Sequence, residues 1–183
     1  IRCDIGEFRQ VEAMLDGKEF AYVYHLAAEF GRVNGEKHYE TIWKTNAIGT
    51  KNILRMQERL KFRMIFTSSS EVYGDYPDIM MEDVPFKHPL RQLNDYAISK
   101  WVNEQQILNS IDRFSTETVI LRLFNNYGPG EPYSPYRSVV CQFIYCAMHD
   151  LPYTCFTNHH RTSSYVGDTI ITMASIIDNF KSG

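Results

Sequence analysis

The chain has 183 residues, of which 44% are hydrophobic and 22% charged, and its formal net charge is −3. This composition is typical of an ordinary soluble globular domain or a large piece of one. The weak negative charge provides no basic field for nucleic acid or an anionic membrane surface. No apolar run approaches the roughly 20 residues of a transmembrane helix, and the first residues lack a signal-peptide core. We therefore expect a cytoplasmic protein without nucleic-acid or membrane partners.

The four cysteines, Cys3, Cys141, Cys146 and Cys155, have neither CxxC spacing nor the density of a disulfide scaffold. We expect reduced and mostly buried thiols. No metal site is predicted.

In the first part of the chain, short apolar runs alternate with longer helical patterns. The opening IRCDI resembles the end of a strand, and EFRQVEAMLDG (7–17) predicts a short helix. AYVYHL (21–26) predicts a buried strand, and a helix is expected over about 36–59. One stripe of that helix carries the positions expected to be buried: Ile42, Thr45, Asn46, Gly49, Ile53 and Met56.

The next elements continue the alternation. RMIFTS (63–68) predicts a strand, which a long loop to about residue 91 separates from a helix that ends near Ser110. TETVILRLF (116–124) predicts the next strand, followed by a loop over 125–136 with three prolines.

The last part predicts a helix near 137–149, a short strand at Tyr153–Thr157 and a final helix from about Gly167 to Phe180. Strands that alternate with helices favour parallel βαβ units, so the fold class expected is a doubly wound parallel α/β sheet. Both ends look cut, because such a domain normally brings its first strand from further upstream. We therefore expect a fragment, or a chain whose ends are not represented.

Polar clusters follow each predicted strand, where open parallel sheets bind their ligands. These clusters are HLAAEF (25–30), TSSSEVYG (67–74) and FNNYGPG (124–130). The predicted helix between the last two strands carries YAISK (96–100), which stacks Tyr96 and Lys100 on one face. Tyr-x-x-x-Lys alone is common in amphipathic helices. The convergence of four clusters on one edge favours a functional site.

The ordered set HLAA, NAIGT (46–50), TSSSEVYG, YAISK and LFNNYGPG resembles the extended short-chain dehydrogenase/reductase family. Within that family, the match is to NAD-dependent nucleotide-sugar epimerases, dehydratases and decarboxylases. The resemblance implies a modified Rossmann domain, present over 1–124 without its first βαβ unit. It also implies a small substrate-binding part over 125–183 that holds a nucleotide-diphosphate sugar.

The resemblance also implies the redox step. Tyr96 takes the proton of a sugar C4 hydroxyl while the hydride passes to NAD. A free phenol has a pKa near 10, and an adjacent ammonium favours the phenolate. Lys100 fits this role and would also bind the nicotinamide ribose, and Ser69 matches the residue that hydrogen-bonds the same sugar oxygen.

Glu71 is the candidate base for the following step at C5, in an epimerisation, dehydration or decarboxylation. In 4,6-dehydratases an aspartic acid stands where this chain has Ser70, which disfavours dehydration. The form Ser-Glu-Val-Tyr-Gly is similar to that of UDP-glucuronate decarboxylases, and simple 4-epimerases commonly lack the glutamate. However, Gly130 replaces an arginine of the decarboxylases. An exposed loop carboxylate is the alternative interpretation of Glu71.

Further cofactor contacts are carried over from the family. Asp4 matches the acidic residue that binds the adenine amino group, and Asn46 matches the asparagine that organises the surroundings of the lysine. The backbone-lining positions after the strands are Leu26, Ala27, Ala28 and Ser68. The glycine-rich turn that receives the pyrophosphate is absent from the sequence. As given, these residues should therefore bind the cofactor weakly.

The substrate residues implied are Ser70, Asn125, Arg137 and Arg161, with Arg161 in the pattern that clamps the diphosphate. The alternative to an enzyme is a non-catalytic nucleotide-binding or assembly module on the same fold. Family members commonly form homodimers through a four-helix bundle. Four apolar residues could supply that surface or lie in the core: Trp43, Ile98, Trp101 and Ile107.

Overall fold

The computed structural model describes residues 1–134, 136–158 and 160–183. Pro135, which falls within the predicted loop 125–136, lies outside the described residues. The same holds for His159, two residues before Arg161, and for the side chains of Arg32–Asn34. The chain forms two compact units, and each is described by itself. The first comprises Ile1–Arg122 with Lys181–Gly183, and the second comprises Leu123–Phe180.

The first unit is built on a sheet of order β1-β2-β3, with β1 at Tyr22–His25, β2 at Arg63–Ser69 and β3 at Thr118–Leu123. β1 and β2 are parallel, with Tyr22 opposite Arg63. Met64 N donates to Glu117 O over 2.9 Å, so β2 and β3 also begin at the same edge. The predicted parallel α/β fold is confirmed, and the carboxyl ends of these strands share one edge.

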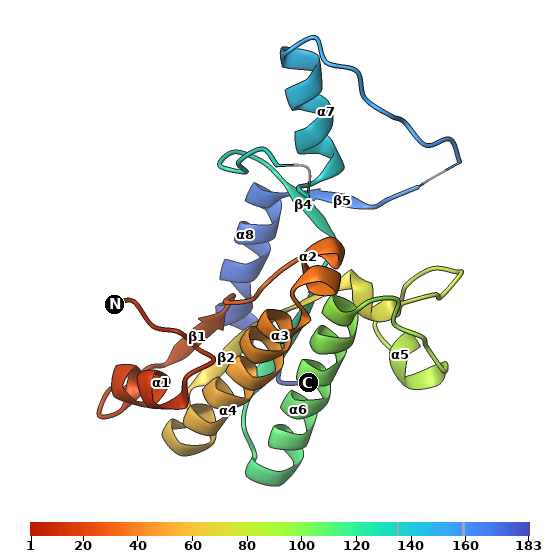
Figure 1. The fold of residues 1–183 in the computed structure, drawn as a ribbon. Coiled ribbons are helices and arrows are strands. Elements are labelled where there is room, and N and C mark those ends of the chain that lie inside the picture. Colours follow the sequence, from red (N-terminus) through yellow and green to blue (C-terminus); the bar gives the residue numbers. More distant parts are fainter. Residues whose placement is uncertain (135, 159) are drawn as a thin grey trace. The chain divides into compact units, whose positions relative to one another are not determined.

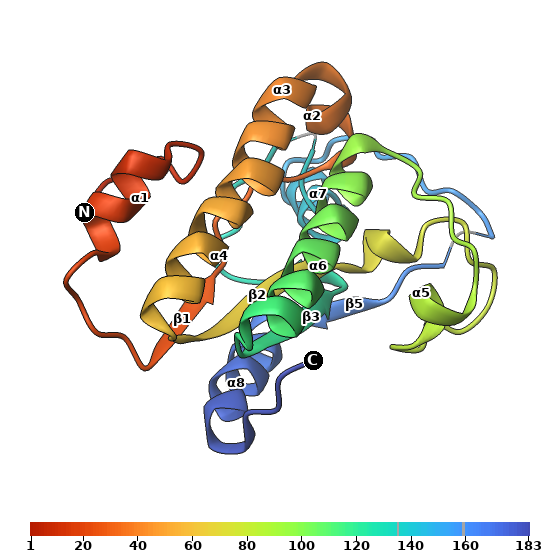
Figure 2. The ribbon, with the colours of Figure 1, turned by 90° about the horizontal axis from the view of Figure 1, so that it is seen from below.

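Two long helices cover one face of this sheet and lie side by side in both ribbon views (Figures 1 and 2). They are α4 (Gly49–Leu60) and α6 (Asp95–Phe114), and α1 (Phe8–Leu15) packs against α4. Val11, Leu54, Phe66 and Ile107 belong to the shared apolar core. Ile107 is therefore a core residue, whereas Ile98 is 37% exposed.

The predicted helix 36–59 exists, but it is not a single α-helix. It consists of α2 (Arg32–Lys37), α3 (Tyr39–Ile42), a π-helical segment (Trp43–Ile48) and α4. Over so short a stretch, the spacing of the apolar residues does not distinguish an α-helix, with 3.6 residues per turn, from the wider turn of a π-helix. The extra residue of the π-helical turn re-aims the side chains before α4, among them Asn46.

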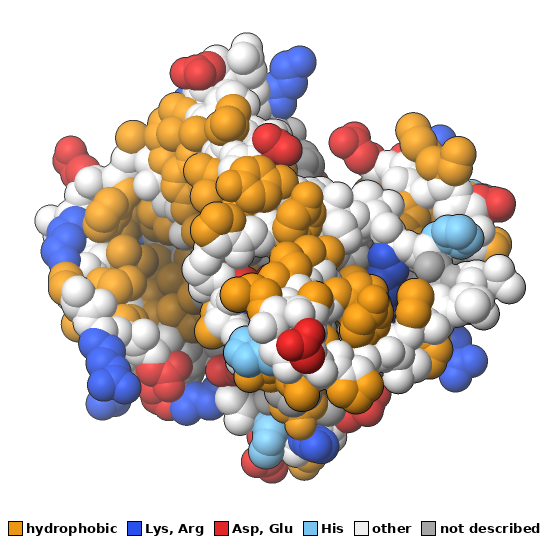
Figure 3. Space-filling model, turned by 90° about the horizontal axis from the view of Figure 1, so that it is seen from above, with side chains coloured by type: hydrophobic (Ala, Val, Ile, Leu, Met, Phe, Trp, Pro, Cys, Tyr) orange, Lys and Arg blue, Asp and Glu red, His pale blue; other side chains and the backbone are white. Residues whose placement is uncertain are grey.

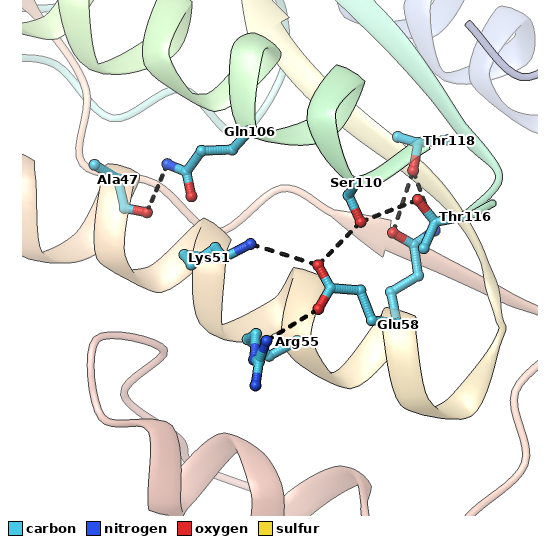
Figure 4. A network of polar contacts seen from close by, with 9 residues as sticks. Ala47, Lys51, Arg55, Glu58, Gln106, Ser110, Thr116 and Thr118 are labelled. Atoms are coloured by element: carbon cyan, nitrogen blue, oxygen red, sulfur yellow. Dashed lines mark hydrogen bonds and ion pairs between the residues drawn. The ribbon is translucent and has the colours of Figure 1, made fainter. Parts of the chain in front are cut away.

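Polar side chains also lie between α4 and α6 (Figure 4). Glu58 accepts from Ser110 Oγ at 3.1 Å and pairs with Lys51 and Arg55. Gln106 Nε2 donates to Ala47 O at 3.2 Å. These contacts satisfy polar groups that the packing of the two helices would otherwise leave without partners.

The opening IRCDI is not in a strand: residues 1–4 have no regular structure and residues 5–6 form a turn. No neighbouring strand pairs with this segment in the part of the chain described, so strand propensity alone does not form one. The long loop after β2 contains a 3₁₀ turn at Ser70–Tyr73 and a short helix α5 at Val84–Lys87.

The second unit contains a small parallel pair, β4 (Asn125–Tyr127) and β5 (Ser163–Tyr165), with α7 (Val139–Met148) and α8 (Val166–Ser175) followed by a 3₁₀ turn at Ile176–Asn179. The predicted loop 125–136 therefore begins as a strand. The prediction of a strand at Tyr153–Thr157 is wrong. Those residues are exposed, and β4 pairs with β5 instead.

Figure 3 shows many hydrophobic side chains at the surface. In this unit Ile144, Met148 and Phe156 are exposed. Of the four unpaired cysteines, Cys155 is exposed and the others are partly buried, so the expectation of mostly buried thiols is only partly met.

Among the residues that the structure describes, no helix has the length and apolar character needed to cross a membrane. The same residues contain no group of three or more His, Cys, Asp or Glu side chains that could hold a metal ion.

Gly74 ends the turn after β2 with φ +58° and ψ −122°, a conformation that side chains oppose. A Cβ there would lie 2.2 Å from Arg91 O, which is backbone and cannot swing away. We expect Gly74→Ala to lower the free energy of unfolding by about 3 kcal/mol in urea titrations, because strain and overlap add. Gly17→Ala, at φ +68° with nothing within 4 Å, should cost only about 1 kcal/mol. Equal losses in the two variants would contradict the predicted overlap.

His25 ends β1 and is buried, with Nε2 3.0 Å from Thr50 Oγ1. Burial, with the charge of Lys100, lowers the pKa of His25 from 6.5 to about 3. Below pH 6.5 the unfolded chain therefore binds a proton that the folded chain does not, so stability falls as the pH falls toward 3.

We expect urea titrations at pH 7 and 5 to show that this proton costs roughly 2 kcal/mol of unfolding free energy, and that His25→Gln abolishes the loss. His38→Gln changes an exposed histidine that makes no side-chain capping bond. It should retain the acid dependence. A His25→Gln protein with the same loss as the parent would count against a neutral buried imidazole.

Candidate functional site

The carboxyl end of β2 turns directly into the 3₁₀ turn, and two capping side chains shape this corner. Ser69 Oγ accepts from Glu71 N at 3.2 Å. Asn94 caps α6 by accepting from Ala97 N at 2.8 Å, and its Nδ2 donates to Glu71 Oε2 at 3.1 Å. The start of α6 is thus bonded to the side chain of Glu71.

Tyr96 and Lys100 lie one turn apart on α6 and face this corner. The Ser69 side chain lies close enough to Tyr96 to lower the pKa of its phenol. Lys100 Nζ donates to Thr67 O at 2.8 Å and lies 6.0 Å from the centroid of the Tyr96 ring. The structure therefore brings Ser69, Glu71, Tyr96 and Lys100 together at the carboxyl edge of the sheet.

The electrostatics of the pair are set mainly by burial. Burial raises the pKa of Tyr96 above its ordinary value, a trend that the Ser69 side chain opposes and the charge of Glu71 reinforces. Burial also lowers the pKa of Lys100 from 10.5 to about 8, against the opposing effect of Glu104. Neither group has its solution acidity, which is typical of functional sites.

Asn46 is fully buried and connects two segments. Its Oδ1 accepts from Glu29 N at 2.8 Å, and its Nδ2 donates to Glu29 O at 3.0 Å and to Ser99 Oγ at 3.0 Å. Ser99 Oγ in turn donates to Tyr96 O. Asn46 therefore connects the loop after β1 to the Ser99 hydroxyl, which in turn bonds the Tyr96 carbonyl.

The remaining residues predicted to bind the cofactor are Leu26, Ala27, Ala28, Asp4 and Ser68, and they do not all lie at one place. Leu26, Ala27 and Ala28 follow β1 at the same edge, with Leu26 55% exposed. Asp4 Oδ1 accepts from Gly6 N at 2.9 Å, and its Oδ2 lies 3.9 Å from Lys44 Nζ. Ser68 is buried, and its hydroxyl donates to Glu104 Oε1. Ser70, predicted to bind substrate, is partly buried in the turn.

Glu104 and Arg122 are missed by the sequence reasoning. Glu104 is fully buried and is bound by Arg122 Nε at 3.0 Å and Nη2 at 2.8 Å. Arg122 Nη1 also donates to Tyr73 Oη at 3.2 Å. The available signal is spacing: Glu104 continues the face of Tyr96 and Lys100 by one more turn. Its arginine partner, 18 residues away on β3, has no such signal.

The other predicted substrate residues belong to the second unit. Asn125 Nδ2 donates to Thr162 O at 2.9 Å. Arg137 lines a hollow of about 410 Å³ together with Gly128, Glu131 and Val166. Arg161 is exposed. All three residues belong to the second unit, whereas Tyr96 belongs to the first.

Comparisons with known proteins agree with this architecture. Over 166 residues the chain is 33% identical to UDP-N-acetyl-alpha-D-glucosaminuronate decarboxylase of Bacillus cytotoxicus, covering 88% of this chain and 51% of that protein. Over 165 residues it is 28% identical to UDP-glucuronic acid decarboxylase 1 of Arabidopsis thaliana, covering 88% of this chain and 38% of that protein.

A solved structure gives the same result. UDP-glucuronic acid 4-epimerase from Bacillus cereus, in complex with UDP-glucuronic acid and NAD, matches with a TM-score of 0.82 at 25% identity. The match covers 100% of this chain and 56% of that one, so the chain spans roughly half or less of these relatives. The sequence also matches the NAD dependent epimerase/dehydratase family over residues 1–183. The chain belongs to the NAD-dependent epimerase/dehydratase family.

Proposed function

We propose that the chain carries the catalytic centre of an NAD-dependent enzyme that oxidises the C4 hydroxyl of a UDP-uronic acid to a transient ketone. The observation that carries this proposal is the placement of Tyr96 and Lys100, one turn apart on α6, beside the end of β2, where Lys100 Nζ donates to Thr67 O and lies 6.0 Å from the centroid of the Tyr96 ring. The names of the relatives support the substrate class, since all three refer to UDP-linked uronic acids.

The residues at this edge fit the nicotinamide end of NAD. An ammonium has three donors, so Lys100 can bind a ribose hydroxyl in addition to Thr67 O. Ala27 and Ala28 are small and at least partly exposed, so backbone after β1 is approachable. The sequence contains no glycine-rich turn, so no pyrophosphate contact is assigned to these residues.

In the proposed reaction, the C4 hydroxyl gives its proton to the Tyr96 oxygen while Ser69 orients the same hydroxyl. NAD, when bound, accepts the hydride from C4, and its positive ring favours the phenolate. The raised pKa of Tyr96 in the chain alone agrees with a base that becomes effective only when further positive charge is present. Lys100 supplies the permanent part of that charge.

A ketone at C4 places a carbonyl β to the C6 carboxylate of a uronic acid. The C5–C6 bond can then break with loss of CO₂, its electron pair passing toward the C4 carbonyl, and a proton is added at C5. Glu71 is the proposed proton-transferring group, because it is partly buried and Asn94 fixes its Oε2. Ser70 disfavours loss of a C6 hydroxyl, because a serine is a poor acid.

We also propose a homodimer formed through the helix that follows HLAA, where Trp43 begins the π-helical segment, and the helix α6 that carries YAISK. Ile98 is 37% exposed and Trp43 and Trp101 are partly exposed, whereas Ile107 is in the core. Three apolar side chains therefore remain available for this interface.

The function is tested by incubating the full chain with NAD and UDP-glucuronic acid, UDP-N-acetylglucosaminuronic acid or UDP-glucose, and following the products by NMR. A C4 epimer, a decarboxylated sugar or a 4-keto sugar from a uronic acid supports the proposal. We expect Tyr96→Phe to lower kcat at least about 100-fold, because the proton acceptor is lost. Tyr153→Phe, at an exposed position, should have parental activity. NAD binding without any turnover would favour the binding-module alternative.

The role of Glu71 is tested separately. Glu71→Gln retains an oxygen for Asn94 but cannot transfer a proton, so we expect C4 oxidation to proceed and the C5 step to slow by about 100-fold. The 4-keto sugar and reduced cofactor should accumulate, as seen by NMR and absorbance. Glu82→Gln changes an exposed carboxylate of the same loop and should leave product formation unchanged. If Glu71→Gln forms product at the parental rate, Glu71 is only a loop carboxylate.

A further inference from the structure

Three consecutive residues at the end of β2 lie against the buried face of α6. Ser69 lies close enough to Tyr96 to lower its pKa, Thr67 O accepts from Lys100 Nζ, and Ser68 Oγ donates to Glu104 Oε1. The first two contacts belong to the proposed catalytic group. The third involves a carboxylate that touches neither substrate nor cofactor in the proposed reaction.

Several hydrogen bonds hold the side chain of Glu104 in place. It is fully buried, and the Arg122 guanidinium binds it through Nε and Nη2 from β3. Arg122 is itself fixed by Tyr73 Oη of the 3₁₀ turn and by Glu82 O at 2.6 Å. One carboxylate therefore links β2, β3, α6 and the turn that carries Glu71.

Glu104 also follows Lys100 by one helical turn, about 6 Å along the axis. Among the described residues, the polar groups near Lys100 are the neutral His25 from β1, Thr67 O from β2, and Tyr96 and Glu104 from α6; the Phe66 ring lies 5.0 Å from its Nζ. Arg122 binds Glu104. Within this set Glu104 is the ionisable group that favours the ammonium form of Lys100 against burial.

We propose that Glu104 is a positioning residue: anchored by Arg122, its carboxylate holds Ser68 at the end of β2 and places a negative charge one helical turn from Lys100. The importance of this role for catalysis rests on the function proposed above. It also assigns the Ser68 hydroxyl to the protein interior rather than to the cofactor.

The test is an NMR titration of the Lys100 ε-carbon in selectively ¹³C-lysine-labelled full chain, with Lys100→Arg for assignment. Glu104→Gln should lower the pKa of Lys100 by roughly one unit, because an attractive charge is lost and Arg122 loses its partner. Glu104→Asp retains the charge and should largely restore the pKa. In an active enzyme, the basic limb of the kcat/KM profile should move to lower pH in Glu104→Gln.

Glu58 offers a matched control, because its side chain is 7% exposed, it pairs with two cations of its own helix, and it accepts a hydrogen bond from Ser110 of α6 (Figure 4). Its contact residue Ser110 lies ten residues beyond Lys100, about 15 Å along α6. Glu58→Gln should destabilise the protein and leave the Lys100 titration unchanged. An unshifted Lys100 in Glu104→Gln, or equal shifts in both variants, would overturn the proposal.

If Glu104→Gln does not fold, Ser68→Ala tests the positioning half, because it removes one hydrogen bond and keeps the charge. We expect kcat to fall about three- to tenfold with KM unchanged and the basic limb unmoved. If Ser68→Ala has the parental kcat, the proposal that Glu104 acts by positioning Ser68 is overturned. The Lys100 titration needs no turnover, so a failed substrate panel counts against the proposed function and leaves the Glu104 inference to be decided by NMR.

Discussion

The contact between the end of β2 and the buried face of α6 is the constraint on which the site depends. Thr67 and Ser68 bond there to Lys100 and Glu104, which lie on two successive turns of α6. Burying polar groups is unfavourable unless each finds a partner. The same bonds that satisfy Lys100 and Glu104 also hold α6, and with it Tyr96, beside the end of β2, so stability and site geometry have one physical origin.

A second set of buried polar groups fixes the other side of α6. Asn46 bonds the loop after β1 to Ser99, which bonds the carbonyl of Tyr96. Asn46 lies in the π-helical segment. Its bonds in the structure run to Glu29 and Ser99, and the role in organising the surroundings of Lys100 stays a prediction.

Burial also controls the charges of the site. His25 and Lys100 lie close enough to influence each other, and burial disfavours the charged form of both. His25 becomes neutral, whereas Lys100 has the Glu104 carboxylate one turn away and retains a pKa of about 8. The carboxylate is tolerated in the interior because Arg122 and Ser68 satisfy its oxygens. Lys100 can therefore stabilise a phenolate at Tyr96 as a cation, whereas His25 is neutral and adds no second positive charge beside Lys100.

The sequence by itself determined the alternation of strands and helices, the parallel sheet, and the placement of YAISK and TSSSEVYG at one edge, because strand ends and helical spacing are local properties. It failed where partners decide the structure. Tyr153–Thr157 has strand propensity but pairs with no strand among the residues that the structure describes, while Asn125–Tyr127 pairs with Ser163–Tyr165. The π-helical turn, the neutral state of His25 and the ion pair of Glu104 with Arg122 were decided only by tertiary packing. They depend on which side chains from distant segments share a desolvated space, and no local pattern records that.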